Sequence, residues 1–147
     1  MPRDVERARH ALHNMNEFSR FTAGNMCTTD FGKADVVVIL DVLHYIDIAA
    51  QNDVLRRVRD ALAPNGTLLL RVGDAAAGLP FKYSVCVDHV VTFARGHGWS
   101  RMYCRPLIAW RDTLAALGFA VTTMPMHEGT LFANVLLVAK LGQNSKQ

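Results

Sequence analysis

Residues 34–74 read ADVVVILDVLHYIDIAAQNDVLRRVRDALAPNGTLLLRVGD, and this stretch decides the fold class. Its first seven residues are almost entirely apolar and mostly β-branched, as is typical of a parallel strand covered on both faces. A helical pattern over 48–62 follows, and the Pro-Asn-Gly triplet at 64–66 stops it. A second buried run at 67–72 comes next. This order of strand, helix and strand is typical of a right-handed βαβ crossover and indicates an α/β fold.

The flanking segments contain further helices and strands. Apolar residues recur at helical spacing over 2–13 and again over 106–117, where Gly118 follows as the first residue after the helix. The segment 19–23 is a candidate for a short strand. The remaining pattern predicts an antiparallel hairpin, with strands at 118–124 and 132–141.

Length, composition and charge indicate one globular domain, 1–147. Half of the 147 residues are hydrophobic and a fifth are charged, which excludes the disordered and low-complexity classes. The formal net charge of +3 comes without a run of Lys or Arg, so we expect no nucleic acid as a partner. The longest apolar stretch, 34–45, is interrupted by Asp35, Asp41 and His44. It therefore does not predict a membrane span, and no membrane partner is expected.

The cysteines and the N-terminus favour a cytoplasmic protein. Cys27, Cys86 and Cys104 are odd in number and have no C-x-x-C spacing, which argues against a disulfide framework or a zinc site. No other cluster has the spacing of metal ligands, so no metal is expected. The first twelve residues are rich in charge and lack the apolar region of a secretory signal.

The order of motifs across 34–74 resembles the centre of the class I S-adenosylmethionine-dependent methyltransferases. It runs strand, DVLHY, helix, L-x-P-x-G and strand. The Leu-Gly-Phe turn at 117–119 and the closing FANVLLVAKL at 132–141 match the end of that family's domain. The resemblance implies a Rossmann-like sheet, mainly parallel with a C-terminal antiparallel hairpin. It also implies a transferase that uses S-adenosyl-L-methionine to methylate a small-molecule acceptor.

The chain departs from the family at its beginning. Family members start with a strand, a G-x-G-x-G loop, a helix and a second strand ending in an acid, and none of these is present. Residues 2–12 resemble the helix that follows that acid, so we expect a truncated domain that lacks the first two strands and the Gly-rich motif. The alternative to an active methyltransferase is therefore a fragment that does not bind the cofactor alone and acts as an oligomerising or pseudo-enzyme module.

The resemblance assigns cofactor contacts to two places. Gly24, Asn25 and Met26 stand where the family commonly has a Gly-Asp-x triplet, so Asn25 would face the adenine amino group and Met26 would offer its backbone amide. Asp41 and His44 follow the strand at 34–40, and ligands of open α/β sheets bind at the carboxyl ends of strands. Both side chains have an alternative reading, since Asp41 can simply end a strand and His44 can be a packing or capping residue.

The acceptor side is expected in the later segments. Residues 74–103 lack a clear period, and we interpret them as a lid or insertion. The candidates for a base that deprotonates an oxygen acceptor are His97 and His127. The expected substrate-binding residues, whose alternative reading is ordinary core or solvated side chains, are Tyr83, Arg101 and Arg105.

The absence of two strands has a consequence for the sheet. If the family's strand order is inherited, the strand at 34–40 has an open edge, and open edges invite pairing with another chain. The gap can close by pairing with the strand at 19–23, or by two chains exchanging or adding strands. We therefore expect a homodimer.

Overall fold

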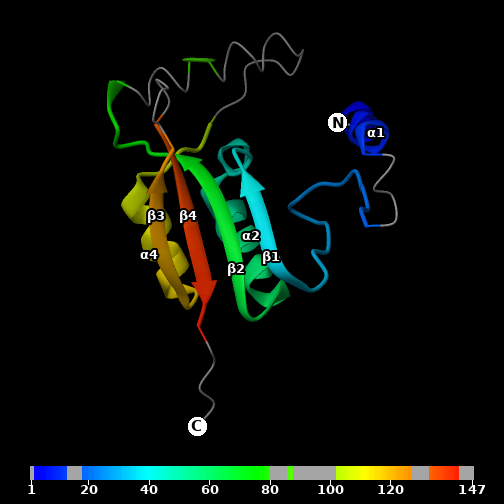
Figure 1. Ribbon diagram of the computed structural model, residues 1–147. Helices are drawn as coiled ribbons and strands as arrows, with labels where there is room; N and C mark the ends of the chain where they lie inside the picture. Colours follow the sequence, from blue (N-terminus) through cyan, green and yellow to red (C-terminus); the bar gives the residue numbers. More distant parts are fainter. Residues whose placement is uncertain (1, 13–17, 80–85, 88–101, 127–132, 143–147) are drawn as a thin grey trace. The chain divides into compact units, whose positions relative to one another are not determined.

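The computed structural model describes residues 2–12, 18–79, 86–87, 102–126 and 133–142 (Figure 1). The chain divides into two compact units, Met1–Asp30 and Phe31–Gln147.

The N-terminal unit contains one helix and an extended segment that ends in a turn. Helix α1 spans Pro2–Ala11, which confirms the helix predicted at this end of the chain. The Arg9 Nη2 atom donates to the carbonyl oxygen of Phe21 at 2.9 Å and ties the extended segment to the helix. The strand predicted at 19–23 is wrong, because no strand forms in the described part of this unit. A strand exists only where a neighbouring strand supplies its ladder of hydrogen bonds, and the described residues of this unit contain no such strand.

The second unit is built on a four-stranded sheet in the order β1-β2-β4-β3. Strand β1 spans Ala34–Leu40 and pairs in parallel with β2, Leu62–Gly73. Strand β4, Asn134–Leu141, is antiparallel to both β2 and β3, Phe119–Pro125. The predicted βαβ unit and the C-terminal antiparallel hairpin are both confirmed.

Strand β2 begins earlier than the sequence suggests. Helix α2, Ile48–Ala61, ends just before it, and the Pro-Asn-Gly triplet lies inside the strand as an irregularity rather than after the helix. The pairing jumps from Ala34 opposite Leu62 to Val36 opposite Thr67. Gly66 is required here, because a Cβ atom at this position would lie 2.8 Å from the Ala63 carbonyl oxygen.

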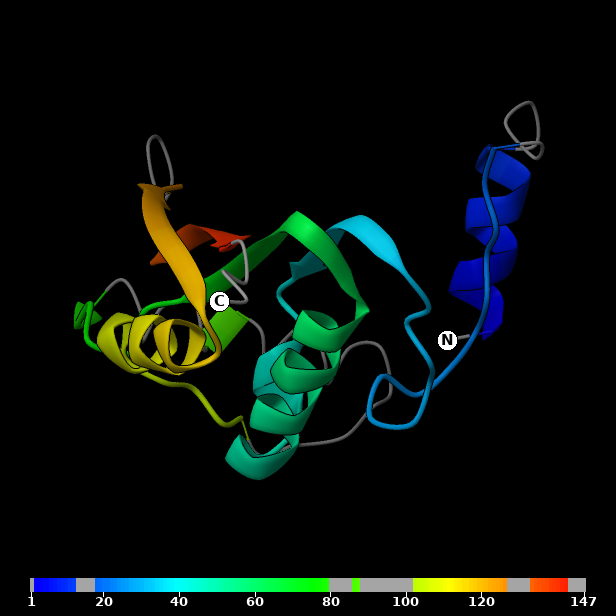
Figure 2. The same ribbon diagram turned by 90° about the horizontal axis from the view of Figure 1, so that it is seen from below.

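The helices of this unit cover one face of the sheet. Helix α2 and helix α4, Leu107–Ala116, lie on the same side (Figure 2). The side chains of β2 alternate, so that its buried residues point to the helices and the others point away. The core between the layers is formed by the following buried residues: Val54, Leu55, Val58, Leu68, Leu70, Val72, Trp110, Leu114, Leu137 and Ala139.

The opposite face of the sheet is open among the described residues of this unit. Val36 and Val38 are 53% and 55% exposed, and Leu40 and Met124 are exposed as well. The expectation that β1 is covered on both faces is therefore wrong. A run without polar residues predicts burial on both sides only when both sides have a covering layer.

Asp74 fixes the start of α4, and Gly118 follows its end. Asp74 Oδ1 accepts hydrogen bonds from the backbone nitrogens of Leu107 and Ala76, each at 2.9 Å, and thereby caps the helix from a distant part of the chain. Gly118 follows the helix with a φ of +88°, a conformation that glycine adopts without strain. The sequence predicts this glycine at the end of the helix, and the structure confirms it.

Candidate functional site

The carboxyl end of β1 carries an aspartate in a strained conformation. Asp41 has a φ of +52°, in the left-handed region that residues other than glycine seldom adopt. Its backbone nitrogen donates to the Arg71 carbonyl oxygen at 3.3 Å, which continues the β1–β2 pairing by one residue. Strained backbone of this kind is found preferentially at functional sites. The backbone conformation of Asp41 thus indicates a candidate site at this strand end, independently of the sequence pattern.

Arg71 holds the carboxylate of Asp41. Its Nε atom donates to Asp41 Oδ2 at 2.8 Å, and its Nη2 atom donates to the same oxygen. The hydrogen bond to Asp41 raises the pKa of Arg71, so the guanidinium stays charged. Both side chains are about one-third exposed, at 32% and 36%. The pair therefore orients the carboxylate at the surface of the strand end rather than inside the core.

A short turn follows Asp41 and carries the predicted histidine. The 3-10 helix η2 spans Leu43–Tyr45, and the ring of His44 lies 4.1 Å from the ring of Tyr45, measured between centroids. Tyr103 reaches this turn from far along the chain, since its backbone nitrogen donates to the His44 carbonyl oxygen at 2.8 Å. Asp47 then caps α2 by accepting from the Ala50 nitrogen.

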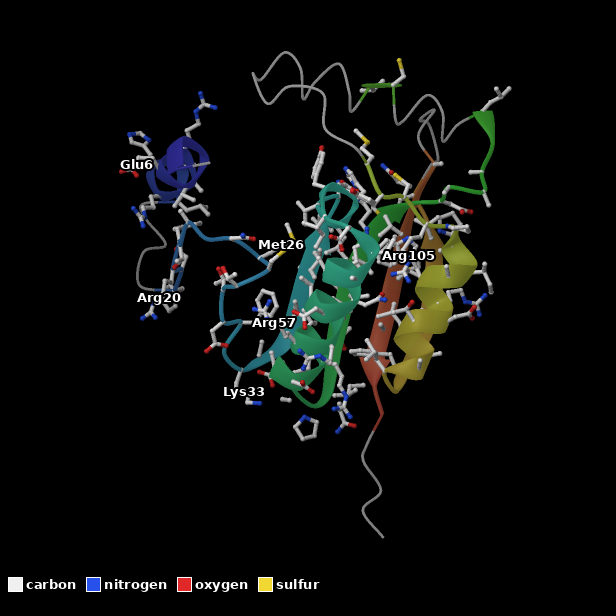
Figure 3. All side chains as sticks on the ribbon, turned by 180° about the vertical axis from the view of Figure 1, so that it is seen from behind. Glu6, Arg20, Met26, Lys33, Arg57 and Arg105 are labelled. Atoms are coloured by element: carbon white, nitrogen blue, oxygen red, sulfur yellow. The ribbon has the colours of Figure 1, made fainter. Side chains whose placement is uncertain are left out.

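The predicted substrate residue Arg105 lies between the two helices (Figure 3). Its Nη1 atom donates to Asn52 Oδ1 in α2 at 3.0 Å, and its Nη2 atom donates to Thr113 Oγ1 in α4 at 2.9 Å. The guanidinium carbon lies 4.7 Å from the centre of the Trp110 ring. Burial lowers the pKa of Arg105 from its ordinary value. These contacts give Arg105 a structural task, and substrate binding by this residue stays a prediction.

The Gly24-Asn25-Met26 segment forms a turn in the N-terminal unit. Asn25 Oδ1 accepts from the Cys27 nitrogen at 3.0 Å, and the Asn25 carbonyl oxygen accepts from the nitrogens of Thr28 and Thr29. A Cβ atom at Gly24 would lie 2.5 Å from Thr29 Oγ1, so a larger residue here would require the Thr29 side chain to shift. Contact of this segment with a cofactor stays a prediction.

The ends of the predicted lid at 74–103 are joined. The Ala75 nitrogen donates to the Arg105 carbonyl oxygen at 3.3 Å, and Asp74 binds the first turn of α4. The chain therefore leaves the end of β2 and returns beside it at the start of α4. Four of the predicted site residues lie outside the described residues, namely Tyr83, His97, Arg101 and His127.

Three other kinds of feature are absent from the described residues. Within the described part of the chain, no group of three His, Cys, Asp or Glu residues could hold a metal ion. None of the cysteines, all three of which are described, forms a disulfide. No helix in the described ranges is both long and apolar enough for a membrane span.

Comparison with known proteins connects this geometry to a family. Residues 2–68 match the model of the family described as a methyltransferase domain. This match includes the predicted cofactor residues and reaches through β1 and α2 into β2. No curated protein matches the sequence.

Solved structures match the fold over almost the whole chain. An O-methyltransferase family protein from Burkholderia thailandensis is 20% identical with a TM-score of 0.69, and the match covers 97% of this chain and 42% of that chain. An O-methyltransferase family 2 protein from Planctomyces limnophilus, in complex with apigenin, is 16% identical with a TM-score of 0.72, covering 95% and 41%. Human N-acetylserotonin methyltransferase in complex with SAM is 16% identical with a TM-score of 0.62, covering 87% and 36%.

The chain spans less than half the length of these structures. The parallel β1–β2 pair, the crossover helix between its strands and the C-terminal antiparallel hairpin are the elements that the sequence resemblance implied. The chain therefore has the fold of the class I S-adenosylmethionine-dependent methyltransferases, and its resemblance to that family is confirmed.

Proposed function

We propose that the chain takes part in S-adenosylmethionine-dependent methyl transfer to a small-molecule acceptor, at the carboxyl ends of β1 and β2. The observation that carries this proposal is the strained Asp41, whose carboxylate Arg71 orients at the strand end where open α/β sheets bind ligands. The family match over residues 2–68 includes this position.

The described residues fit the polar, nucleoside part of this cofactor. Asp41 offers an oriented and accessible carboxylate, and the turn at Asn25 offers backbone and amide groups. The sequence contains no G-x-G-x-G loop to surround the remainder of the molecule. In this proposal Asp41 and His44 of the second unit bind the nucleoside part. The assignment of Gly24, Asn25 and Met26 to cofactor binding is a separate proposal for the N-terminal unit.

The bound cofactor supplies a methyl group activated by its sulfonium, and the protein contributes mainly by positioning. Tyr83, Arg101 and Arg105 are the proposed acceptor contacts. His97 or His127 takes the proton from an oxygen acceptor. The similar structures of O-methyltransferase family proteins support oxygen as the methylated atom.

A second candidate function has its own supporting observations. The sequence lacks the Gly-rich loop, and Arg71 neutralises the Asp41 carboxylate that a ligand hydroxyl would otherwise meet. In this alternative the chain does not bind the cofactor alone and acts as an oligomerising module. Strand β1 supports it, because among the described residues no strand pairs with its outer edge. Under either function we propose a homodimer that pairs along this edge.

Isothermal titration calorimetry with S-adenosylmethionine separates the two candidates. The enzyme proposal predicts micromolar binding to the wild type, and at least about tenfold weaker binding to Asp41→Asn because the oriented carboxylate is lost. Asp60→Asn is the matched control, since it removes one exposed carboxylate from the far end of α2. Equal affinity of both variants would contradict the assignment of Asp41. An absence of heat with the wild type at high ligand concentration favours the oligomerising module.

A further inference from the structure

The core of the second unit contains a polar side chain that packing alone does not explain. Gln51 is 0% exposed and is the buried polar residue among the described side chains. It lies at the end of the first turn of α2, on the face that otherwise carries Val54, Leu55 and Val58. An apolar residue of the same size would fill this space without the cost of burying an amide.

Three backbone carbonyl oxygens surround the Gln51 amide nitrogen. The Nε2 atom donates to Leu43 O at 3.1 Å, to Ile46 O at 3.0 Å and to Tyr103 O at 2.8 Å. An amide nitrogen has two hydrogens, so the three acceptors share them. The Oε1 atom is buried and has no hydrogen-bond partner among the described residues. The side chain thus bears an unpaired acceptor in the core, and its donors compensate for part of that cost.

The three carbonyl groups belong to two segments that meet at the proposed site. Leu43 and Ile46 flank His44 and Tyr45 in the turn after Asp41. Tyr103 lies where the chain returns from the segment at 74–103 toward α4. The backbone hydrogen bond from Tyr103 to His44 joins the same two segments directly.

A neighbouring contact strengthens this junction. Asn52, the next residue of α2, accepts from Arg105, which is two residues after Tyr103. Two consecutive side chains of α2 therefore hold the returning segment. The turn that carries His44 and the segment that carries Arg105 become one unit fixed to α2.

We propose that Gln51 is a positioning residue for methyl transfer. It fixes the turn at 43–46, on the donor side, against the segment at 103–105, on the acceptor side. This inference rests on the proposed function, which places cofactor and acceptor at this end of the sheet. Gln51 itself touches neither molecule in this proposal and acts through the backbone of the two segments.

The experiment compares Gln51→Met with Val58→Ala in the full chain. Methionine has nearly the shape of glutamine and lacks its donors, so the variant removes the three hydrogen bonds with little change in volume. Val58 lies two turns further along the same face of α2 and is also fully buried, so Val58→Ala destabilises the core without touching the two segments. The pair separates a local effect from a general loss of stability.

The first measurement is amide hydrogen exchange without ligand. Gln51→Met should accelerate exchange at Tyr45, Ile46 and Tyr103, whose amides are hydrogen-bonded in this junction, by about tenfold relative to the amides of β2. The nuclear magnetic resonance signal of the His44 imidazole should shift or broaden in this variant only. Val58→Ala should accelerate exchange across the unit without favouring these positions.

The second measurement is the affinity for S-adenosylmethionine by calorimetry. Binding should weaken by about tenfold in Gln51→Met and remain near the wild-type value in Val58→Ala. If exchange at the junction amides is no faster in Gln51→Met than in Val58→Ala, Gln51 does not hold the two segments together. Faster exchange with unchanged affinity overturns the positioning role. If the wild type itself does not bind, the proposed function fails, and the exchange comparison still decides whether Gln51 joins the two segments.

Discussion

The two faces of the sheet are built from the same strands and differ in what covers them. On one face, Leu68 and Leu70 are completely buried beneath α2 and α4. On the other, Val36, Val38 and Leu40 stand exposed although they are just as apolar. Residues of β2 alternate between these environments from one position to the next.

This difference shows that the hydrophobicity of a strand's sequence does not by itself determine whether its side chains are buried. The apolar run of β1 is suited to a sheet with two covering layers, and the second unit provides one layer among its described residues. The exposed face and the free edge of β1 are therefore the surfaces at which we expect a second polypeptide chain to bind. The covered face should dominate stability, and the open face should dominate association.

The largest expected effect tests the covered face. Leu70→Ala removes a fully buried side chain at the centre of the sheet and should lower the free energy of unfolding by about 3 kcal/mol. Leu69→Ala, one residue earlier on the partly exposed face, should cost less than about 1 kcal/mol. Urea unfolding followed by circular dichroism measures both. Equal losses would mean that the second face is packed as tightly in solution as the first.

A smaller effect tests how the helix layer is attached. Asp74→Ala leaves the first amide of α4 without its acceptor and should cost about 1–2 kcal/mol. Asp74→Asn retains an oxygen in the same place and should retain most of this stability. The same unfolding measurement applies. If the two variants lose the same amount, the contribution of Asp74 comes from its charge and not from capping.

The ion pair at the strand end should contribute still less to stability. Asp41→Asn breaks a partly exposed pair and should cost less than about 1 kcal/mol. The raised pKa of Arg71 means that its stabilising contribution is fully present below the ordinary pKa of arginine and is lost only as pH rises through the higher folded value. Arg71 stays charged well below the ordinary pKa of arginine. Its contribution to the difference in free energy of unfolding between the wild type and Asp41→Asn should therefore be constant between about pH 7 and 9. A difference that grows or shrinks within this window in urea titrations would contradict that reading.

The smallest effect on stability tests the open face. Val38→Lys places a charge on an exposed position of the edge strand and should change the free energy of unfolding by less than about 0.5 kcal/mol. It should nevertheless convert the proposed dimer to a monomer, since lysine on an edge strand opposes strand pairing. Sedimentation velocity measures the change. Thr122→Lys, on the same face but on the opposite edge strand β3, is the control and should leave the dimer intact. Dimers that persist in Val38→Lys place the interface elsewhere.

The sequence predicts the elements whose signals are local. The apolar run of β1, the cap at Asp47 and the glycine after α4 each specify their own conformation, and the structure confirms all three. The segment at 19–23 has strand-like composition and forms no strand, because a strand depends on a partner that composition does not reveal.

The site residues that the sequence analysis missed depend on contacts between distant segments. Arg71 meets Asp41 only through the register that pairs Leu40 with Arg71. Gln51 interrupts an apolar helix face, and this interruption was a signal available in the sequence. Its meaning required knowing that Tyr103 returns to the same place.

The central claim is that the carboxyl end of β1 and β2 binds the methyl donor, and mapping by nuclear magnetic resonance tests it most directly. The isotope-labelled chain is titrated with S-adenosylmethionine while the backbone amide signals are recorded. Within the second unit the shifts should concentrate at residues 41–46, with Val38 and Thr122 unchanged. Shifts spread over the exposed face of the sheet, or no shifts at any concentration, would contradict it.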